Sequence, residues 1–461
     1  MKRAIKFFIG VLICCAADIM AQPQGPIYSS VRYEDDYTFL VNGRGSDPFN
    51  QFKKIPAGGS VELTFGGQYR FRFEHDANRR FGASNPPSQS FYLNRLYVFG
   101  DLRLGRRARL FGEFKYAGIT DNELPAALTA HEKPDLQNLF AEIWLRHQER
   151  EKVSLRAGRQ ELLFGKQRLI GLSDWANSRR TFDAIRLLVQ PAGWKFDAFV
   201  AHPLELNPDE INKTDRSQTF TGVYAQRPMK GQTIAAYYLA LHEDDSLIKN
   251  GSGSTGNFIY HTLGFAGDGA ATNFDWTGEA AYQFGDFGGD AIRAYMASFE
   301  GGYTFARLGM KPRIGIGLNL ASGDNDPADA RQKTFNPLFP ASHPVLGWAD
   351  QVGRRNIKTL EALFTAAPHR RIGVKIQGLK FSLANKHDAL YNAGGAVSRR
   401  DVTGAAGNDA GFEIDAELSV NINVHARIQF GYARFVPGEF IEKTGARATH
   451  NLIYLMAPFT F

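Results

Sequence analysis

The most basic stretch of the sequence runs from Gly158 to Leu187 and reads GRQELLFGKQRLIGLSDWANSRRTFDAIRL. A guanidinium is planar, stays charged at physiological pH and binds a carboxylate through two parallel hydrogen bonds. The stretch is therefore a candidate for recognising an anionic substrate by charge, without a chemical step. Its cationic residues, set against one glutamate and two aspartates, are Arg159, Lys166, Arg168, Arg179, Arg180 and Arg186.

Period-two alternation surrounds this stretch and recurs from Val61 to the end of the chain. In residues 61–73 apolar side chains share one face, while Glu62, Arg70 and Arg72 share the other. A soluble sandwich buries its apolar face and seldom lines the other face so densely with charge. A membrane barrel turns apolar residues to lipid and polar residues to its lumen. The pattern therefore predicts an all-β chain that forms a transmembrane antiparallel β-barrel.

The alternation predicts eighteen strands, an even number that allows a closed antiparallel barrel. Short links alternate with mostly long ones, as expected of a barrel with short periplasmic turns and long outside loops. No stretch approaches the roughly 18 uninterrupted apolar residues of a membrane helix. The predicted strands are 61–73, 90–104, 107–118, 138–147, 152–163, 180–190, 193–201, 217–227, 232–242, 258–266, 273–284, 290–305, 311–321, 355–366, 371–383, 411–420, 423–435 and 449–461.

The first residues predict secretion. Lys2, Arg3 and Lys6 precede an apolar run at 7–17, and a small residue for cleavage follows. This order is typical of a secretory signal peptide, whose apolar run is too short to span a bilayer. We therefore assign residues 1–21 to a signal peptide.

Both cysteines, Cys14 and Cys15, are expected to leave with the signal peptide. The mature chain is expected to carry a second targeting signal at its C-terminal end. Residues 22–59 show no clear pattern and are expected to form a periplasmic N-terminal segment, followed by the barrel at 60–461. Alternating apolar residues lead to a terminal Phe461, which is similar to the closing-strand signal read by the bacterial outer-membrane assembly machinery. We predict a location in the bacterial outer membrane, with its lipid and that machinery as partners.

The positive charge must face water. An arginine facing lipid at mid-depth costs about 2–4 kcal/mol. Arg159 lies near the outer end of the fifth predicted strand, and the loop 164–179 that follows can fold back into the mouth. The charges either cancel in a mixed wall or form a basic constriction whose acidic partners hold each guanidinium. Lumen-facing candidates on other strands are Arg70, Arg72, Arg103, Arg109, Lys115, Lys375 and Arg427, with Glu62, Glu113, Glu413, Asp415 and Glu417.

Other motifs add little chemistry. Asp324, Asp326 and Asp329 in the run SGDNDPAD could bind Ca²⁺, because hard cations take clustered carboxylates, or could belong to a solvated loop. The sequence contains no P-loop, no HExxH zinc motif and no nucleophile elbow, so no further cofactor is predicted. A net charge of +7 on 461 residues is mild and does not indicate a nucleic-acid partner.

Several longer blocks resemble the alginate-export family of outer-membrane channels. They are AGRQELLFGKQRLIGLSDWANSRRTFDAIRL at 157–187, SGDNDPADARQKTFNPLFPASHPVLGWADQVGRRN at 322–356, HDALY at 387–391, GFEIDAEL at 411–418 and FVPGEF at 435–440. The resemblance implies an eighteen-stranded barrel with an arginine-lined, electropositive constriction that passes an acidic polysaccharide outward. This chain departs from the family pattern at Ala141, before Glu142 of AEIW, where the pattern has an arginine. The resemblance places along the conduit Arg159, Asp174, Arg179, Arg180, Asp183, Glu413, Asp415 and Arg427.

These observations predict a passive, monomeric channel for an anionic, alginate-like polysaccharide. An anion-selective porin for uptake of small acidic saccharides or other anions shares every residue-level feature and stays open as an alternative. An enzyme built in a barrel would need a nucleophile or paired carboxylates at the rim, and none stands out. The predicted pore-lining residues are Arg72, Arg103, Glu142, Arg159, Asp174, Arg179, Arg180, Asp183, Arg186, Glu413, Asp415 and Arg427.

Overall fold

The computed structural model describes residues 28–37, 40, 47–148, 150–244, 247–250, 253–326 and 328–461. The predicted signal peptide with its two cysteines lies outside the described residues. Contacts divide the chain into two units at Gln51 and Phe52. The first contains η1 (Arg32–Glu34) and most of η3 (Pro48–Phe52). The second begins before the predicted residue 60, because β1 (Ile55–Pro56) pairs with the first long strand.

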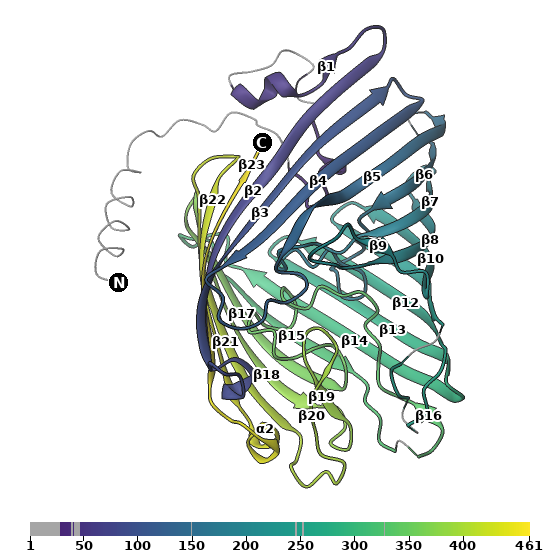
Figure 1. Ribbon diagram of the computed structural model, residues 1–461. Coiled ribbons are helices and arrows are strands. Elements are labelled where there is room, and N and C mark those ends of the chain that lie inside the picture. The colour runs from purple at the N-terminus through teal and green to yellow at the C-terminus, as the bar shows by residue number, and fades with distance from the viewer. Residues whose placement is uncertain are drawn as a thin grey trace. The chain divides into compact units, whose positions relative to one another are not determined.

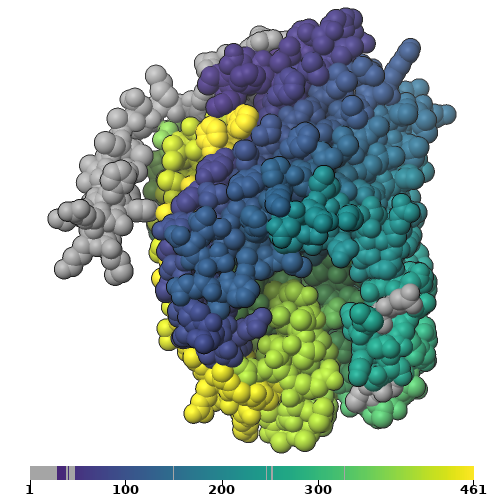
Figure 2. All heavy atoms as spheres, viewed as in Figure 1, coloured from purple at the N-terminus to yellow at the C-terminus, as the bar shows by residue number. Residues whose placement is uncertain are grey.

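The second unit is a closed antiparallel β-barrel of 18 long strands, as predicted. Each strand pairs with the next along the chain, so the colours of Figure 1 run round the barrel from purple to yellow. The ring closes where β2 (Val61–Ala77) pairs with β23 (His450–Thr460), and in Figure 2 the yellow C-terminal residues lie against the N-terminal strands. The other long strands are β3 (Ser88–Leu104), β4 (Ala108–Thr120), β5 (Glu132–His147), β6 (Lys152–Gln160), β7 (Phe182–Gln190), β8 (Lys195–Glu205), β10 (Gln218–Met229), β11 (Gln232–Glu243), β12 (Phe258–Ala271), β13 (Phe274–Phe287), β14 (Asp290–Thr304), β15 (Arg313–Ala321), β17 (Ile357–His369), β18 (Ile372–Leu383), β21 (Asp409–Asn421) and β22 (Arg427–Pro437).

The links between these strands contain short elements. Among the residues that the structure describes, no helix has the length and apolar character needed to cross a membrane. The short elements are η4 (Arg79–Gly82), β9 (Lys213–Thr214), β16 (Arg331–Gln332), β19 (Ala389–Tyr391), β20 (Val397–Arg400) and α2 (Glu439–Thr444).

Alternation along each strand sorts the side chains between lipid and lumen. On β4, Phe114 is 61 % exposed on the outer surface, while its neighbours Glu113 and Lys115 are buried inside. Successive side chains of a strand point to opposite faces, so the polar residues line the interior. The terminal Phe461 continues the pairing to the last residue, because its backbone exchanges hydrogen bonds of 2.9 and 3.0 Å with Gly67 of β2.

Two long loops, residues 161–181 and 322–356, fold into the lumen and bind each other. The N–H of Gly171 donates to the carbonyl of Phe339, and the N–H of Phe339 donates to the carbonyl of Leu169, both at 2.9 Å. Phe339 also packs edge-on against Phe182 of β7 and Phe220 of β10. The inward course of loop 161–181 agrees with the prediction for residues 164–179.

Candidate functional site

The centre of the site is the carboxylate of Asp174 on loop 161–181. Arg179 Nε lies 2.6 Å from Asp174 Oδ1, and Arg95 of β3 approaches the same oxygen at 2.9 Å. Both guanidiniums are buried, whereas the Asp174 side chain is 52 % exposed. Desolvation disfavours the charged carboxylate, but the charges of Arg179, Arg95 and Arg70 outweigh it and hold the pKa of Asp174 well below its usual range. Asp174 is therefore ionised at neutral pH.

Two arginines of β2 hold the same loop by its backbone and its tryptophan. Arg70 Nη2 donates to the carbonyl of Ala176 at 2.8 Å. The Arg72 guanidinium lies 3.9 Å from the centre of the Trp175 ring and pairs with Glu74 at 2.6 Å. A cation over an indole face is attracted by the ring quadrupole, so Arg72 holds the Trp175 ring in place in addition to pairing with the carboxylate of Glu74. We call four residues the arginine cluster: Arg70, Arg72, Arg95 and Arg179.

Ion pairs between neighbouring strands line the lumen nearer the short turns. Each pair joins a buried arginine to a buried carboxylate, so the guanidinium planes are held in fixed orientations. Glu142 in addition accepts a hydrogen bond of 2.7 Å from Ser154. The pairs are Arg109 with Asp101 at 2.7 Å, Arg156 with Glu142 at 2.8 Å, and Arg186 with Asp197.

Two predicted lining residues lie in the lumen at the short-turn rim. Arg103 of β3 pairs with Asp101 at 3.1 Å, and Arg427 of β22 pairs with Glu417 at 3.4 Å. Both side chains are 43 % exposed. Arg427 is the first residue of its strand, so it does not join the arginine cluster. The predicted residues therefore do not form one ring but occupy two depths of the barrel.

Arg159 and Asp183 differ from the prediction. Arg159 lies three residues from the lumen-facing Arg156, an odd number, so its side chain points to the opposite face of the wall. It pairs with Asp183 across β6 and β7 at 3.1 Å and donates to the carbonyl of Asn212 at 3.2 Å. Thr214 donates to Asp183 at 2.6 Å. The structure thus places this pair beneath the loop before β10 rather than along the lumen.

Glu413 and Asp415 face inward but are not open lining. Both are fully buried, because loop 322–356 covers them. The N–H of Ala349 donates to Glu413 Oε1 at 2.8 Å, and that of Trp348 donates to Asp415 Oδ2 at 3.3 Å. Gln377 of β18 donates to Asp415 at 2.7 Å. These two carboxylates therefore anchor the loop inside the barrel.

Arg180 joins the two inward loops. Its Nη1 donates to the carbonyls of Phe339 at 2.5 Å and Pro340 at 3.0 Å. Desolvation lowers its pKa to about 10, which leaves the guanidinium charged at neutral pH. Arg354, in loop 322–356, is likewise buried, and desolvation lowers its pKa to about 10. Its Nη1 donates to Asn319 at 3.0 Å.

The three aspartates proposed for Ca²⁺ are not brought together as ligands. Asp329 pairs with Lys333 at 2.5 Å. Asp324 Oδ1 accepts the backbone N–H of Asp326 at 3.1 Å. Within the described ranges, no group of three or more His, Cys, Asp or Glu side chains that could hold a metal ion is found.

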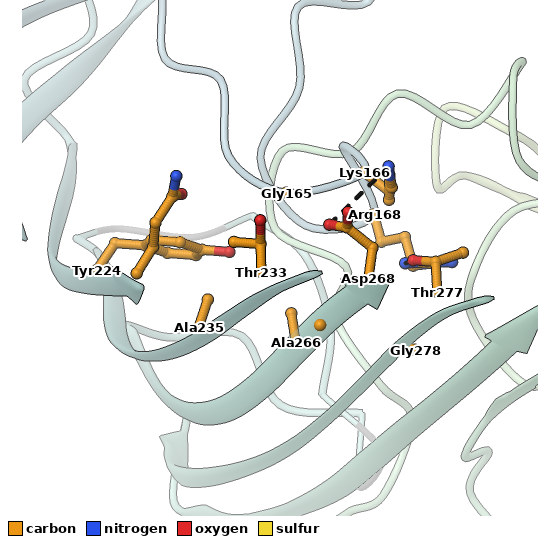
Figure 3. Close-up of a pocket in the computed structure, with 12 residues that line it drawn as sticks. Gly165, Lys166, Arg168, Tyr224, Thr233, Ala235, Ala266, Asp268, Thr277 and Gly278 are labelled. Carbon is orange, nitrogen blue, oxygen red and sulfur yellow. Dashed lines mark hydrogen bonds and ion pairs between the residues drawn. The ribbon is translucent and has the colours of Figure 1, made fainter. Parts of the chain in front are cut away.

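A cavity of about 800 Å³ opens beside the tip of loop 161–181, on the side of the short turns. Lys166 of the loop lies with its Nζ 4.0 Å from Asp268 Oδ1 of β12, and Arg168 pairs with Glu279 of β13 at 3.5 Å. Arg313 of β15 lines the same cavity and pairs with Glu300 at 2.9 Å. Figure 3 shows an adjoining pocket of about 200 Å³, where Lys166 reaches toward Asp268 above the strands.

Comparisons with known proteins agree with this geometry. The family model described as alginate export matches residues 61–454. The chain belongs to the alginate export family. No curated protein matches the chain in sequence. Its fold is similar to solved outer-membrane proteins of Pseudomonas aeruginosa: OpdK (10 % identity, TM-score 0.58), OccK8 (12 %, 0.57) and OpdQ (12 %, 0.56). Each likeness covers 87 % of this chain and 97–98 % of the other.

The family and the fold together place the protein in the bacterial outer membrane, and they are those of channels. The departure from the family pattern at Ala141 falls outside the lumen. Ala141 is exposed and pairs with Leu110, which is 49 % exposed on the outer surface. Glu142, the next residue, turns inward to Arg156. The departure therefore leaves the lumen charges of this member of the alginate export family unchanged.

Proposed function

We propose that the protein is a passive channel that conducts an anionic, alginate-like polysaccharide and selects it with the arginine cluster. The observation that carries the proposal is the half-exposed carboxylate of Asp174 held in the lumen by buried guanidiniums. Such a site is already shaped for a carboxylate, because its donors are fixed before any substrate arrives. Transport of this kind needs no chemical step, and the gradient sets its direction.

Charge count supports recognition of anions at this depth. The arginine cluster contributes four guanidiniums, whereas the carboxylates in contact with it are those of Asp174, Glu74 and Glu161. Trp175 lies between Arg72 and His343 of the other inward loop, so both faces of its ring are occupied and the site offers charge rather than a stacking face. A polyuronate presents a carboxylate at each residue, so it matches the positive charge of the arginine cluster.

A second candidate is an anion-selective porin for small acidic solutes. Loops 161–181 and 322–356 bind each other across the lumen, which favours passage of small molecules over passage of a polymer. OpdK, whose fold is similar at 10 % identity, has been solved with vanillate, a small carboxylate. The two candidates differ in the length of substrate that passes.

Planar-bilayer recordings with a length series of oligouronates separate these candidates. A polysaccharide channel is expected to be blocked by oligouronates, with residence times that grow with chain length, and far less by neutral oligosaccharides of equal length. Arg72→Lys should keep the preference for anions but weaken the block, because lysine lacks the planar fork. A small-anion porin should conduct the monomer and exclude long chains. Indifference of the wild-type current to all oligouronates would contradict both.

A further inference from the structure

The lipid-facing surface of the barrel carries its positive charge unevenly. The outward positions of β3 and β4, both fully described, hold no charged residue, and Leu96, Leu110 and Phe114 are exposed there. On a different sector, three cations alternate with buried neighbours and therefore point outward. We call them the outer cations: Lys358 between Ile357 and Thr359, Lys380 between Leu379 and Phe381, and Arg434 between Ala433 and Phe435.

The outer cations lie at similar depth in the membrane. Lys358 pairs in register with Ser382, which is two residues beyond Lys380 on β18. Lys380 in turn pairs with Phe412, which is two residues from the partner of Arg434 on β21. From β17 to β18 to β22, each cation therefore lies two register positions nearer the short turns than the one before it. Strands of such barrels tilt by about 35–45°, so residues of equal depth run diagonally across the register.

The long-loop ends of the strands shift in the same direction round the barrel as these cations. Pro437, at the end of β22, pairs with Gly411, whereas His450, at the start of β23, pairs with Phe435. Each outer cation is at most three residues from the long-loop end of its strand, which is within about 10 Å at a rise of about 3.4 Å per residue. Long loops face outside in barrels of this kind, so the outer cations lie at the outer leaflet.

The protein supplies little counter-charge at this surface. Lys380 pairs with Asp409 at 2.5 Å, and both side chains stay nearly half exposed. Arg434 donates to Asn451 at 3.3 Å, an oxygen that it shares with the hydroxyl of Tyr432. For Lys358 no hydrogen bond or ion pair is found within the part of the chain that the structure describes. Three cations against one carboxylate leave a net positive patch facing lipid.

We infer that the outer cations bind the phosphate groups of a phosphorylated glycolipid in the outer leaflet. Guanidinium and ammonium groups bind phosphate through charge-assisted hydrogen bonds and are attracted to anionic lipid headgroups. The polar neighbours Ser382, Asn451 and Tyr432 supply hydroxyl and amide groups for a sugar headgroup, while exposed Leu360 and Phe430, which lie on the membrane side of the cations, suit its acyl chains. This surface is separate from the lumen, so lipid binding there does not depend on the transported substrate.

Native mass spectrometry of the purified barrel tests the inference with three probes: bisphosphorylated lipid A, lipid A stripped of its phosphates, and inorganic phosphate. The wild-type protein should retain the bisphosphorylated lipid and lose most of that binding when the phosphates are absent. The triple variant Lys358→Gln, Lys380→Gln, Arg434→Gln should bind the bisphosphorylated lipid roughly a hundredfold more weakly. Inorganic phosphate should not compete at equal concentration, because it lacks the lipid anchor.

A matched control removes three exposed cations at the short-turn end by Arg227→Gln, Lys230→Gln and Lys311→Gln. This control should bind the bisphosphorylated lipid like the wild type, and both triple variants should keep the heat-modifiable gel shift of a folded barrel. Equal lipid binding by wild type and the outer-cation variant would overturn the inference. So would equal binding of the phosphorylated and dephosphorylated lipids, which would reduce the outer cations to general interfacial anchors.

Discussion

The lumen has two unlike walls. On β2–β8 many of the inward side chains are charged and are joined as ion pairs such as Arg156 with Glu142. On β10–β14 they are mostly apolar or aromatic, and Tyr224 and Tyr237 stack with their ring centres 5.4 Å apart. In both walls side chains alternate between the lumen and the lipid face, and antiparallel backbone hydrogen bonds join neighbouring strands. The difference shows that one barrel backbone accepts buried ion pairs on one side of the lumen and aromatic packing on the other.

Loop 161–181 contacts both walls. Its second half, around Asp174 and Trp175, is held by the arginine cluster on the charged wall. Its first half packs on the aromatic wall, where the ring of Phe164 lies 4.7 Å from that of Tyr224. The loop is therefore positioned by electrostatics on one side and by packing on the other, and the two kinds of contact should fail differently when they are broken.

The largest effect on stability is expected from the charged wall. Arg156→Ala leaves Glu142 buried without its cation, which should cost about 3–5 kcal/mol in the free energy of unfolding. Denaturant unfolding of the barrel in detergent measures this loss. The double variant Arg156→Leu, Glu142→Leu should recover most of it, because no charge is then left unpaired. A single variant as stable as the wild type would mean that water reaches Glu142 and that this wall is not tightly packed.

A smaller effect on stability is expected from the aromatic side. Phe339→Ala removes a ring that packs on Phe182 and Phe220, and Phe339 is only partly buried, so the loss should fall at or below the lower end of about 3–5 kcal/mol. Its main consequence should be greater motion of both inward loops, visible as larger current fluctuations in a planar bilayer. Phe339→Leu, which keeps much of the apolar volume, should show quieter currents. Identical noise in both variants and the wild type would argue against packing as the restraint.

The fold was accessible from the sequence because alternation is local. Each of the eighteen predicted strands has a counterpart, with errors mainly at the ends. The strand predicted from residue 138 begins at Glu132, because residues 132–137 carry polar side chains and register shifts that hide the period. Whether Phe461 serves as an assembly signal stays a prediction, although its pairing with β2 is in place.

The site was accessible only in part. Alternation alone would have separated Arg159 from Arg156, but the family resemblance placed Arg159 in the conduit, and the structure places it on the other face. Arg95 was missed, although it shares the inward face of β3 with Tyr97 and Asp101. How deeply loops 161–181 and 322–356 enter the barrel has no periodic signal in the sequence. Their position depends on contacts between segments far apart in the chain, which a reading of single segments does not contain.

The reversal potential of single channels in a salt gradient tests most directly whether the arginine cluster selects anions. Arg72→Gln and Arg159→Gln form a matched pair, because each removes one guanidinium that contacts a carboxylate, but only Arg72 lies in the lumen. We predict an anion-selective wild type, a clear loss of selectivity in Arg72→Gln and little change in Arg159→Gln. The preference should weaken in strong salt, because the Debye length falls from about 10 Å at 0.1 M to about 3 Å at 1 M. A cation-selective wild type, or equal shifts in both variants, would contradict anion selection by the arginine cluster.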